Sequence, residues 1–132
     1  MYLKKTLEYL KDRKIIVEIY GLGYVGFPLA VKLSKEGIKV NGIDINKNRI
    51  NRLKKNDLLD SEINLKLEFI QSIENGNLTL DNKPSKKDIP KIGIICVPTP
   101  IPNEKIQSDI YVKSAVEMFL SSSNYGDVII LE

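Results

Sequence analysis

Residues 15–44 read IIVEIYGLGYVGFPLAVKLSKEGIKVNGID, and the order of patterns in this stretch decides the fold. A β-rich run over 15–20 stops at a glycine, which predicts a strand followed by a sharp turn. Apolar residues then recur every fourth position over 24–35, which predicts an amphipathic helix. A second apolar run over 38–43 predicts another strand. A strand, a helix and a strand in this order predict a right-handed βαβ unit with parallel strands.

The rest of the chain continues the alternation of strands and helices. Further helices are expected over 1–12, 46–55 and 64–74 and from 109 onward, further strands over 78–80, 92–97 and 128–131, a polar link with room for one helical turn over 81–91, and a proline-rich loop over 98–107. Five strands alternating with helices predict an α/β fold with a doubly wound parallel sheet. Because such sheets usually have a sixth strand, we expect a truncated piece of a longer protein.

Local signals place several helix ends. Asn46 and Asp109 are expected to cap the helices that follow them, and Gly37 to close the helix that begins near Tyr24. In the last helix, every fourth residue from Val112 to Leu120 is apolar, which predicts its buried stripe.

The composition excludes several classes of protein. With 132 residues, 42% of them hydrophobic and 28% charged, the chain has the balance of one globular domain. Its net charge of +3 is too small, and its basic residues too scattered, for a nucleic-acid-binding protein. No apolar run has the length of a membrane span, and residues 1–14 alternate charged and apolar side chains, unlike a signal peptide. We therefore expect a soluble, cytoplasmic protein without a membrane or nucleic-acid partner.

Histidine is absent and Cys96 is the single cysteine. These residues therefore supply no imidazole base, no intrachain disulfide and no cysteine-rich zinc site. Because Cys96 ends an apolar strand and has no histidine to activate it, we expect a buried structural thiol rather than a nucleophile. No catalytic residue and no metal ligand is predicted.

Residues 21–26 read GLGYVG and fit the pattern G-x-G-x-x-G between a strand and a helix. Gly21 allows the sharp turn, Gly23 lets a pyrophosphate approach the backbone, and Gly26 lets the helix pack closely on the sheet. The helix N-terminus then offers N–H groups and a partial positive charge to the anion. The motif predicts a Rossmann-type dinucleotide site, whereas the plain alternative is a tight turn without a ligand.

Asp44 ends the second strand, 18 residues beyond Gly26. A carboxylate at this place can accept both ribose hydroxyls of an adenosine and would repel a 2′-phosphate, which favours NAD over NADP. Arg49 instead favours NADP, since a nearby arginine can accommodate that 2′-phosphate. The alternatives are a solvated strand end or helix cap for Asp44 and a solvated helix residue for Arg49.

The segment Cys96-Val97-Pro98-Thr99-Pro100 leaves the fourth strand at its carboxyl end, where ligands of open α/β sheets bind. Two prolines hold Thr99 stiffly, so it can contact the nicotinamide half of the cofactor at little entropic cost. A rigid strand exit without a ligand contact explains the same pattern equally well.

Taken together, four segments resemble the UDP-glucose/GDP-mannose dehydrogenase family, the nucleotide-sugar dehydrogenases. They are IYGLGYVGFPLA (19–30), GIDIN (42–46), IICVPTP (94–100) and VIILE (128–132). The resemblance covers about 15–132 and implies the N-terminal NAD-binding Rossmann domain of such an enzyme, preceded by an amphipathic helix over 1–14.

The family oxidises the C6 alcohol of a UDP- or GDP-sugar to the uronate with two NAD, a step in polysaccharide biosynthesis. Its catalytic cysteine, lysine, asparagine and aspartate, its dimer-forming helix and its sugar-nucleotide domain would all follow this sequence. The resemblance therefore implies a chain that binds NAD as a monomer without turnover, and a full-length homodimer that takes the nucleotide sugar.

By the family's pattern, Tyr24 and Val25 line the pyrophosphate turn, Asp44 and Arg49 hold the adenosine ribose, and Thr99 lies near the reaction centre. The full set implied for the cofactor is Gly21, Leu22, Gly23, Tyr24, Val25, Gly26, Asp44, Ile45, Arg49, Val97, Pro98, Thr99 and Glu132.

Three residues depart from what such a domain leads us to expect. Glu18 places a charge inside a central strand, where burial is costly without a partner. Tyr20 stands where the family usually has a small or aliphatic residue, and Gly93 weakens the fourth strand.

Two other classes of protein share the first half of this pattern. Regulatory nucleotide-binding modules of potassium channels and transporters are Rossmann-like and catalyse nothing, and the β-hydroxyacid dehydrogenases begin in a similar way. The VPTP loop at 97–100 disfavours both.

Overall fold

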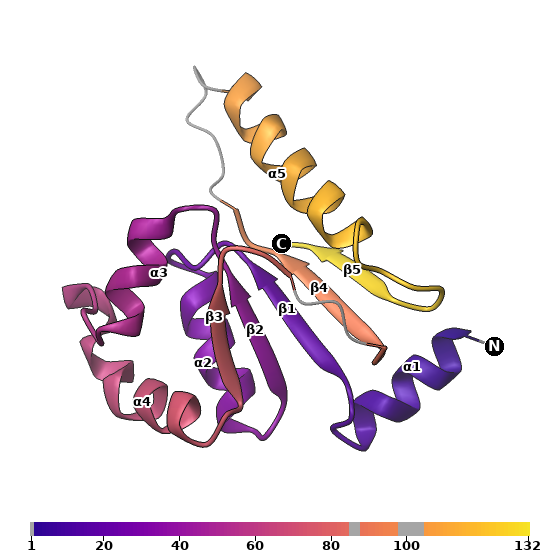
Figure 1. Cartoon of the computed structure of the whole chain (residues 1–132), viewed down its shortest axis with the longest axis horizontal. Coiled ribbons are helices and arrows are strands. Elements are labelled where there is room, and N and C mark those ends of the chain that lie inside the picture. Colours follow the sequence, from indigo (N-terminus) through magenta and orange to yellow (C-terminus); the bar gives the residue numbers. More distant parts are fainter. Residues whose placement is uncertain (1, 85–87, 98–104) are drawn as a thin grey trace.

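The computed structural model describes residues 2–84, 88–97 and 105–132. Five parallel strands form one sheet (Figure 1), namely β1 (Ile16–Tyr20), β2 (Lys39–Ile43), β3 (Leu78–Asp81), β4 (Lys91–Ile95) and β5 (Val128–Leu131). The strand order β3-β2-β1-β4-β5 is that of a Rossmann-type doubly wound sheet. The predicted fold class is confirmed.

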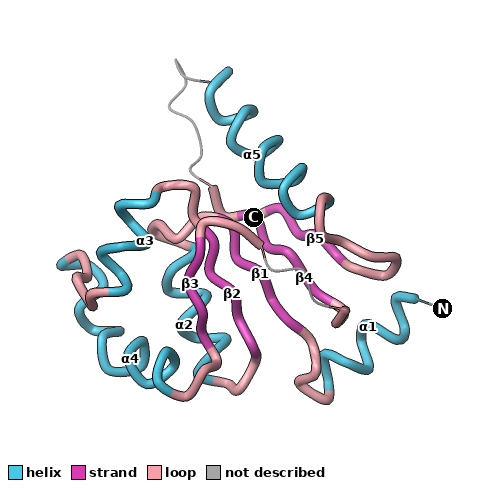
Figure 2. The backbone as a smooth tube through the Cα atoms, viewed as in Figure 1, coloured by secondary structure: helices cyan, strands magenta, loops and turns pink. Residues whose placement is uncertain are grey.

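Helices cover both faces of the sheet (Figure 2), namely α1 (Tyr2–Lys11), α2 (Gly26–Lys35), α3 (Lys47–Lys54), the 3₁₀ helix η1 (Asp60–Leu65), α4 (Lys66–Glu74) and α5 (Lys105–Leu120). Helices α2, α3 and α4 pack on one face. The larger core lies there, where Phe27 and Phe69 pack with inward-facing strand residues such as Ile19 of β1 and Val40 of β2. Helix α5 packs on the opposite face through Phe119. None of the helices in the described ranges is long and apolar enough to cross a membrane.

The direction in which the chain adds strands reverses at β1, because β1 pairs with β2 on one side and with β4 on the other. Gly21, Asp44, Cys96 and Glu132 are each the first residue after a strand. Parallel strands end at the same edge of the sheet, so these four residues gather at the switch point, the usual ligand position in this fold.

Most predicted elements are confirmed within one or two residues, and their local signals explain the agreement. The Asn46 side chain caps α3 by accepting hydrogen bonds from the backbone N–H groups of Asn48 and Arg49. Gly37 follows α2 with a φ of +87°, a conformation that favours glycine.

One detail of the predicted elements is wrong, and one element was not predicted. Helix α5 begins at Lys105, so Asp109 lies inside it and does not cap it. The helix predicted over 64–74 is preceded by the separate turn η1. In the link over 81–91, residues 85–87 lie outside the described part of the chain, so the helical turn for which it has room stays a prediction.

The predicted buried stripe of α5 is only partly right, because Val116 packs against the smaller core but Leu120 does not. Leu120 is 58% exposed, whereas Ala115 and Phe119 are buried against the sheet. The Phe119 ring lies over Gly93, where an added Cβ would meet its Cδ2 at 2.5 Å. Gly93 therefore makes room for the helix, which explains a glycine that looked like a weakness of β4.

Glu18 is buried in β1 and has the partner that its burial requires. Lys91 Nζ lies 2.9 Å from Glu18 Oε1, and the side chains are 6% and 1% exposed. The Tyr20 hydroxyl donates to the same carboxylate at 3.1 Å, and Lys91 also bonds to Ser122 after α5. The two unexpected residues of β1 thus belong to one polar network beneath α5.

Helix α1 packs against the turn before β5. The Thr6 hydroxyl donates to the Gly126 carbonyl at 2.6 Å, and the Tyr2 and Tyr125 rings stack with centroids 6.1 Å apart. The division into a helix over 1–14 and a domain over 15–132 stays a prediction.

Candidate cofactor-binding site

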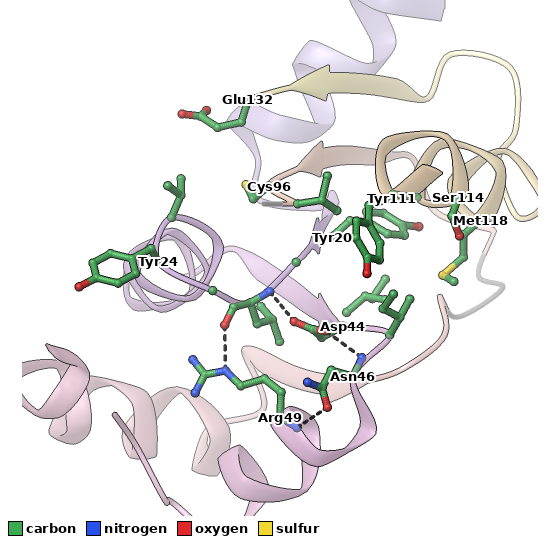
Figure 3. A pocket seen from close by; sticks show the side chains of 18 residues that line it. Tyr20, Tyr24, Asp44, Asn46, Arg49, Cys96, Tyr111, Ser114, Met118 and Glu132 are labelled. Carbon is green, nitrogen blue, oxygen red and sulfur yellow. Dashed lines mark hydrogen bonds between the residues drawn. The ribbon is translucent and has the colours of Figure 1, made fainter. Parts of the chain in front are cut away.

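A cavity of about 750 Å³ opens at the carboxyl ends of the strands (Figure 3). Its floor is the glycine turn and its walls come from the ends of β2, β4 and β5 and from α5. The sequence-predicted residues Gly21 to Val25, Asp44, Ile45, Arg49, Val97 and Glu132 all line it. Gly26 lies behind the turn, and Pro98 and Thr99 lie outside the described residues.

Each glycine of the turn has its own steric reason. Gly21 has a φ of +96°, and a Cβ there would lie 2.7 Å from the Cys96 carbonyl oxygen. A Cβ on Gly26 would lie 1.7 Å from the Gly21 carbonyl oxygen, so that position cannot carry a side chain in this fold. At Gly23 nothing lies within 4 Å. The first and third glycines serve the fold, while the second leaves open space at the cavity.

Helix α2 starts at this turn without a side-chain cap. Its N-cap is Val25, which offers no side-chain acceptor, whereas Asn46 caps α3. The first N–H groups of a helix have no partner within the helix. In α2 the Phe27 N–H already donates to the Gly23 carbonyl at 3.2 Å, and Pro28 has no N–H, so the helix start offers an anion the Gly26 N–H and a partial positive charge.

Asp44 is half-buried at the wall of the cavity and already holds two backbone groups. Its Oδ2 accepts from the Leu22 N–H at 2.9 Å and its Oδ1 from the Asn46 N–H at 2.9 Å. Each carboxylate oxygen has a further lone pair. Asp44 can therefore accept two hydroxyl groups from the cavity without releasing the turn.

Arg49 is engaged by protein groups. Its Nε donates to the Leu22 carbonyl at 2.9 Å, its Nη2 pairs with the Glu62 carboxylate, and its guanidinium carbon lies 5.2 Å from the centre of the Phe27 ring. The side chain is only 12% exposed. Arg49 thus grips the glycine turn from the side of α3.

The cysteine has the environment expected of a structural thiol. Cys96 is buried at the cavity wall beside the glycine turn. Burial, and less strongly the carboxylate of Glu132, raises the pKa of the Cys96 thiol to about 11. The thiol is therefore neutral near pH 7 and a poor nucleophile.

Two groups of residues at the site escaped sequence reasoning. Glu62 is buried in η1, and no local pattern marks it as the partner of Arg49. Tyr111, Ser114 and Met118 of α5 also line the cavity. Their spacing along α5 places these residues on one face of the helix, but the buried face predicted from the sequence was only partly right and so did not identify them.

The mouth of the cavity is partly apolar. Tyr24 is 85% exposed beside Val25, and Ile45 is 56% exposed beyond Asp44. Exposed apolar side chains at the rim of a polar crevice are common where a flat ring system binds.

Comparison with known proteins assigns this geometry to a family. Residues 14–132 match the model of the NAD-binding domain of the UDP-glucose/GDP-mannose dehydrogenase family. The chain is 36% identical over 117 residues to the UDP-N-acetyl-D-mannosamine dehydrogenase of Methanocaldococcus jannaschii, covering 86% of this chain and 27% of that protein. It is 29% identical over 116 residues to the enzyme of that name from Yersinia pestis, covering 88% and 27%.

Solved structures agree in fold. The UDP-N-acetyl-mannosamine dehydrogenase of Staphylococcus aureus superposes with a TM-score of 0.75 at 27% identity, covering 89% of this chain and 28% of that chain. A ternary complex of a GDP-mannose dehydrogenase gives a TM-score of 0.66 at 24% identity, covering 87% and 27%, a likeness of fold.

The chain spans about 27% of the length of the curated relatives it matches. The family match also decides against a regulatory channel module. The chain belongs to the UDP-glucose/GDP-mannose dehydrogenase family, and residues 14–132 are its NAD-binding domain.

Proposed function

We propose that the domain holds NAD in this cavity, with the pyrophosphate against residues 21–26 and the adenosine ribose on Asp44. The open space beside Gly23 carries the proposal, because it is the one place in the turn where a missing side chain faces no protein neighbour among the described residues. The backbone N–H groups of the turn from Gly23 to Gly26, at the uncapped start of α2, supply the donors for the diphosphate.

The ribose end of the site fits NAD better than NADP. Asp44 presents a negative charge where a 2′-phosphate would lie. The guanidinium group of Arg49, which could have neutralised that phosphate, is already bound to Leu22 and Glu62. Both features disfavour an extra phosphate.

The nicotinamide half is assigned to the other end of the cavity. Val97 and Glu132 line it, and Thr99 is proposed to complete it next to the reacting carbon. Bound there, NAD supplies the hydride acceptor. The residues of this chain bind and orient the cofactor, and no catalytic role is assigned to any of them.

In the longer protein, we propose that this domain serves the oxidation of a UDP- or GDP-sugar at C6 to the uronate. The relatives that the chain matches are named as nucleotide-sugar dehydrogenases. We propose a cytoplasmic homodimer for that full-length protein and a monomer for the domain alone.

Isothermal titration of the folded domain with NAD and with NADP tests the cofactor assignment. We expect heat on NAD addition and at least tenfold weaker binding of NADP, because Asp44 opposes the added phosphate. A sample with native circular dichroism that gives no heat with NAD would contradict the proposal, as would a preference for NADP.

A further inference from the structure

We propose that Glu62 is a positioning residue for the pyrophosphate subsite and acts through Arg49 on the glycine turn. This inference rests on the proposed NAD site and adds a residue from η1, a segment that does not line the cavity. Glu62 sets the orientation of one peptide group of the turn, and that orientation decides where the donors for the diphosphate point.

The Glu62 carboxylate is fixed from two sides. One oxygen, Oε2, pairs with Nη2 of Arg49, and the other, Oε1, accepts the backbone N–H of Leu59 at 3.0 Å. The side chain is 6% exposed. A buried carboxylate with both oxygens engaged has little freedom to turn, so it holds its arginine in one place.

Arg49 passes this constraint to the turn. Its Nε donates to the Leu22 carbonyl at 2.9 Å, and its guanidinium group lies over Phe27, the residue after Gly26. Nη1 is buried without a partner within the described part of the chain. Without Glu62 the guanidinium would therefore be a buried charge with too few acceptors, and it would have to move toward water.

The peptide that Arg49 holds joins Leu22 to Gly23. The Leu22 N–H is held at the same time by Asp44, at 2.9 Å. The described peptide bonds are all trans, and in a planar trans peptide the N–H of the next residue points opposite to the carbonyl. The Gly23 N–H therefore points away from Arg49.

Figure 3 places Arg49 on one side of the glycine turn and Cys96 and Glu132 on the other. Gly23 lines the cavity, and a Cβ added there would meet no described atom within 4 Å. Releasing the Leu22 carbonyl would let this peptide rotate and would turn a donor away from the diphosphate. The ion pair thus keeps the anion site ready before the cofactor arrives.

A second ion pair provides a matched control. Lys35 and Glu68 join α2 to α4 at 2.9 Å, but these side chains are 58% and 31% exposed, and the pair makes no contact with the turn. Exposed pairs of this kind contribute little to stability. Glu68→Gln therefore removes a carboxylate from the same side of the domain without touching the proposed mechanism.

The test compares Glu62→Gln, Arg49→Lys and Glu68→Gln for binding of NAD, ADP and adenosine, followed by the amide ¹H–¹⁵N shifts of Gly23 and Tyr24. Arg49→Lys keeps a positive charge near Glu62 but loses the Nε donor to Leu22. We expect Glu62→Gln and Arg49→Lys to bind NAD and ADP about tenfold more weakly, with adenosine changed less than about twofold. Glu68→Gln should bind all three ligands like the wild type.

The selective loss of diphosphate ligands is the signature of positioning, because general destabilisation would weaken adenosine and ADP by the same factor. Suppose that the wild type binds NAD. If the variants then lose affinity for adenosine and ADP equally, or lose none, the role of Glu62 is overturned while the NAD site is retained. If both variants fail to fold, the pair is structural and the inference is wrong. If the wild type binds neither NAD nor ADP, the proposed function itself fails.

Discussion

Asp44 has two roles, because it holds the glycine turn through the Leu22 N–H and faces the cavity with its remaining lone pairs. Holding the turn needs no ligand, whereas the lone pairs that face the cavity can accept hydrogen bonds from one. A carboxylate that is already oriented by backbone donors loses little side-chain entropy on binding, so it suits a preformed ribose site.

Asp44→Ala should weaken NAD binding by about tenfold or more, from the worth of a charge-assisted hydrogen bond of about 1.5–3 kcal/mol. Asp44→Asn is the matched variant, since its amide oxygen still accepts but its charge is gone. In calorimetric titrations, Asp44→Asn should reduce the difference in affinity between NAD and NADP. An unchanged NAD affinity in Asp44→Ala would remove Asp44 from the site.

Gly23→Ala and Gly26→Ala should separate ligand binding from folding. At Gly23 an added Cβ meets no protein atom within 4 Å, so stability should change by less than about 1 kcal/mol while NAD binding falls at least tenfold. At Gly26 the Cβ would lie 1.7 Å from a backbone oxygen, so the fold itself should fail. Thermal unfolding and NAD titration of both variants check this, and normal NAD affinity in Gly23→Ala would contradict the site.

The Cys96 thiol should lose its proton only at high pH. Because burial raises its pKa to about 11 from the ordinary 9.0, the neutral thiol stabilises the folded state below pH 9, and this contribution is lost as the pH rises through 11. The rate of alkylation by iodoacetamide should therefore have its midpoint near pH 11, and NAD should slow it. The Cys96→Ala variant supplies the blank, and a midpoint at or below 9 would show an exposed thiol instead.

Among the elements, those fixed by local signals were predictable and those fixed by distant contacts were not. The strand–turn–helix around Gly21 and the Asn46 cap depend on neighbours in sequence, and the structure confirms them. Phe119 is buried because Gly93 lies beneath it, a contact that helical periodicity cannot reveal. Asp109 looked like a cap, but cap preferences of about 1 kcal/mol are easily outweighed by packing elsewhere.

The same distinction holds for the candidate site. The glycine turn and Asp44 were visible as a motif at fixed spacing, because the turn and the strand end are close in sequence. The partner of Arg49 was not visible, since Glu62 reaches it from a 3₁₀ helix that no periodicity predicted. Predicting that Tyr111 and Met118 line the cavity would have required knowing which face of α5 is turned toward the sheet.

The polar network between β1, β4 and α5 predicts an asymmetric mutational response. Lys91→Met should destabilise the domain by about 3–5 kcal/mol, because it leaves Glu18 buried without a counter-charge. Replacing both residues by methionine should recover much of the loss, since no unpaired charge remains. Urea unfolding measures both variants. Lys35→Met, at the exposed pair with Glu68, should change stability by less than about 1 kcal/mol and serves as the control.

On the scale of the whole molecule, the described residues form the wall of the proposed cofactor cavity, and neither an imidazole nor an activated thiol lies among them. Histidine is absent, and the single cysteine is a neutral thiol at the cavity wall. Binding and turnover should therefore separate in this chain.

The domain should raise its melting temperature with NAD without producing NADH from UDP- or GDP-sugars. A saturating ligand at about 100 times its Kd stabilises a folded protein by about 2.7 kcal/mol. Differential scanning fluorimetry with NAD, and NADH absorbance in mixtures with the sugar nucleotides, measure the two properties. Sugar-dependent NADH formation by the purified chain would show that its own residues suffice for catalysis.

The walls of the cavity also give the domain an optical reporter. The sequence contains six tyrosines, three phenylalanines and no tryptophan, so tyrosine dominates its ultraviolet fluorescence. Tyr20, Tyr24 and Tyr111 border the cavity. An arriving nucleotide base would quench this ultraviolet emission directly, and cofactor uptake can be followed in the native chain without any label.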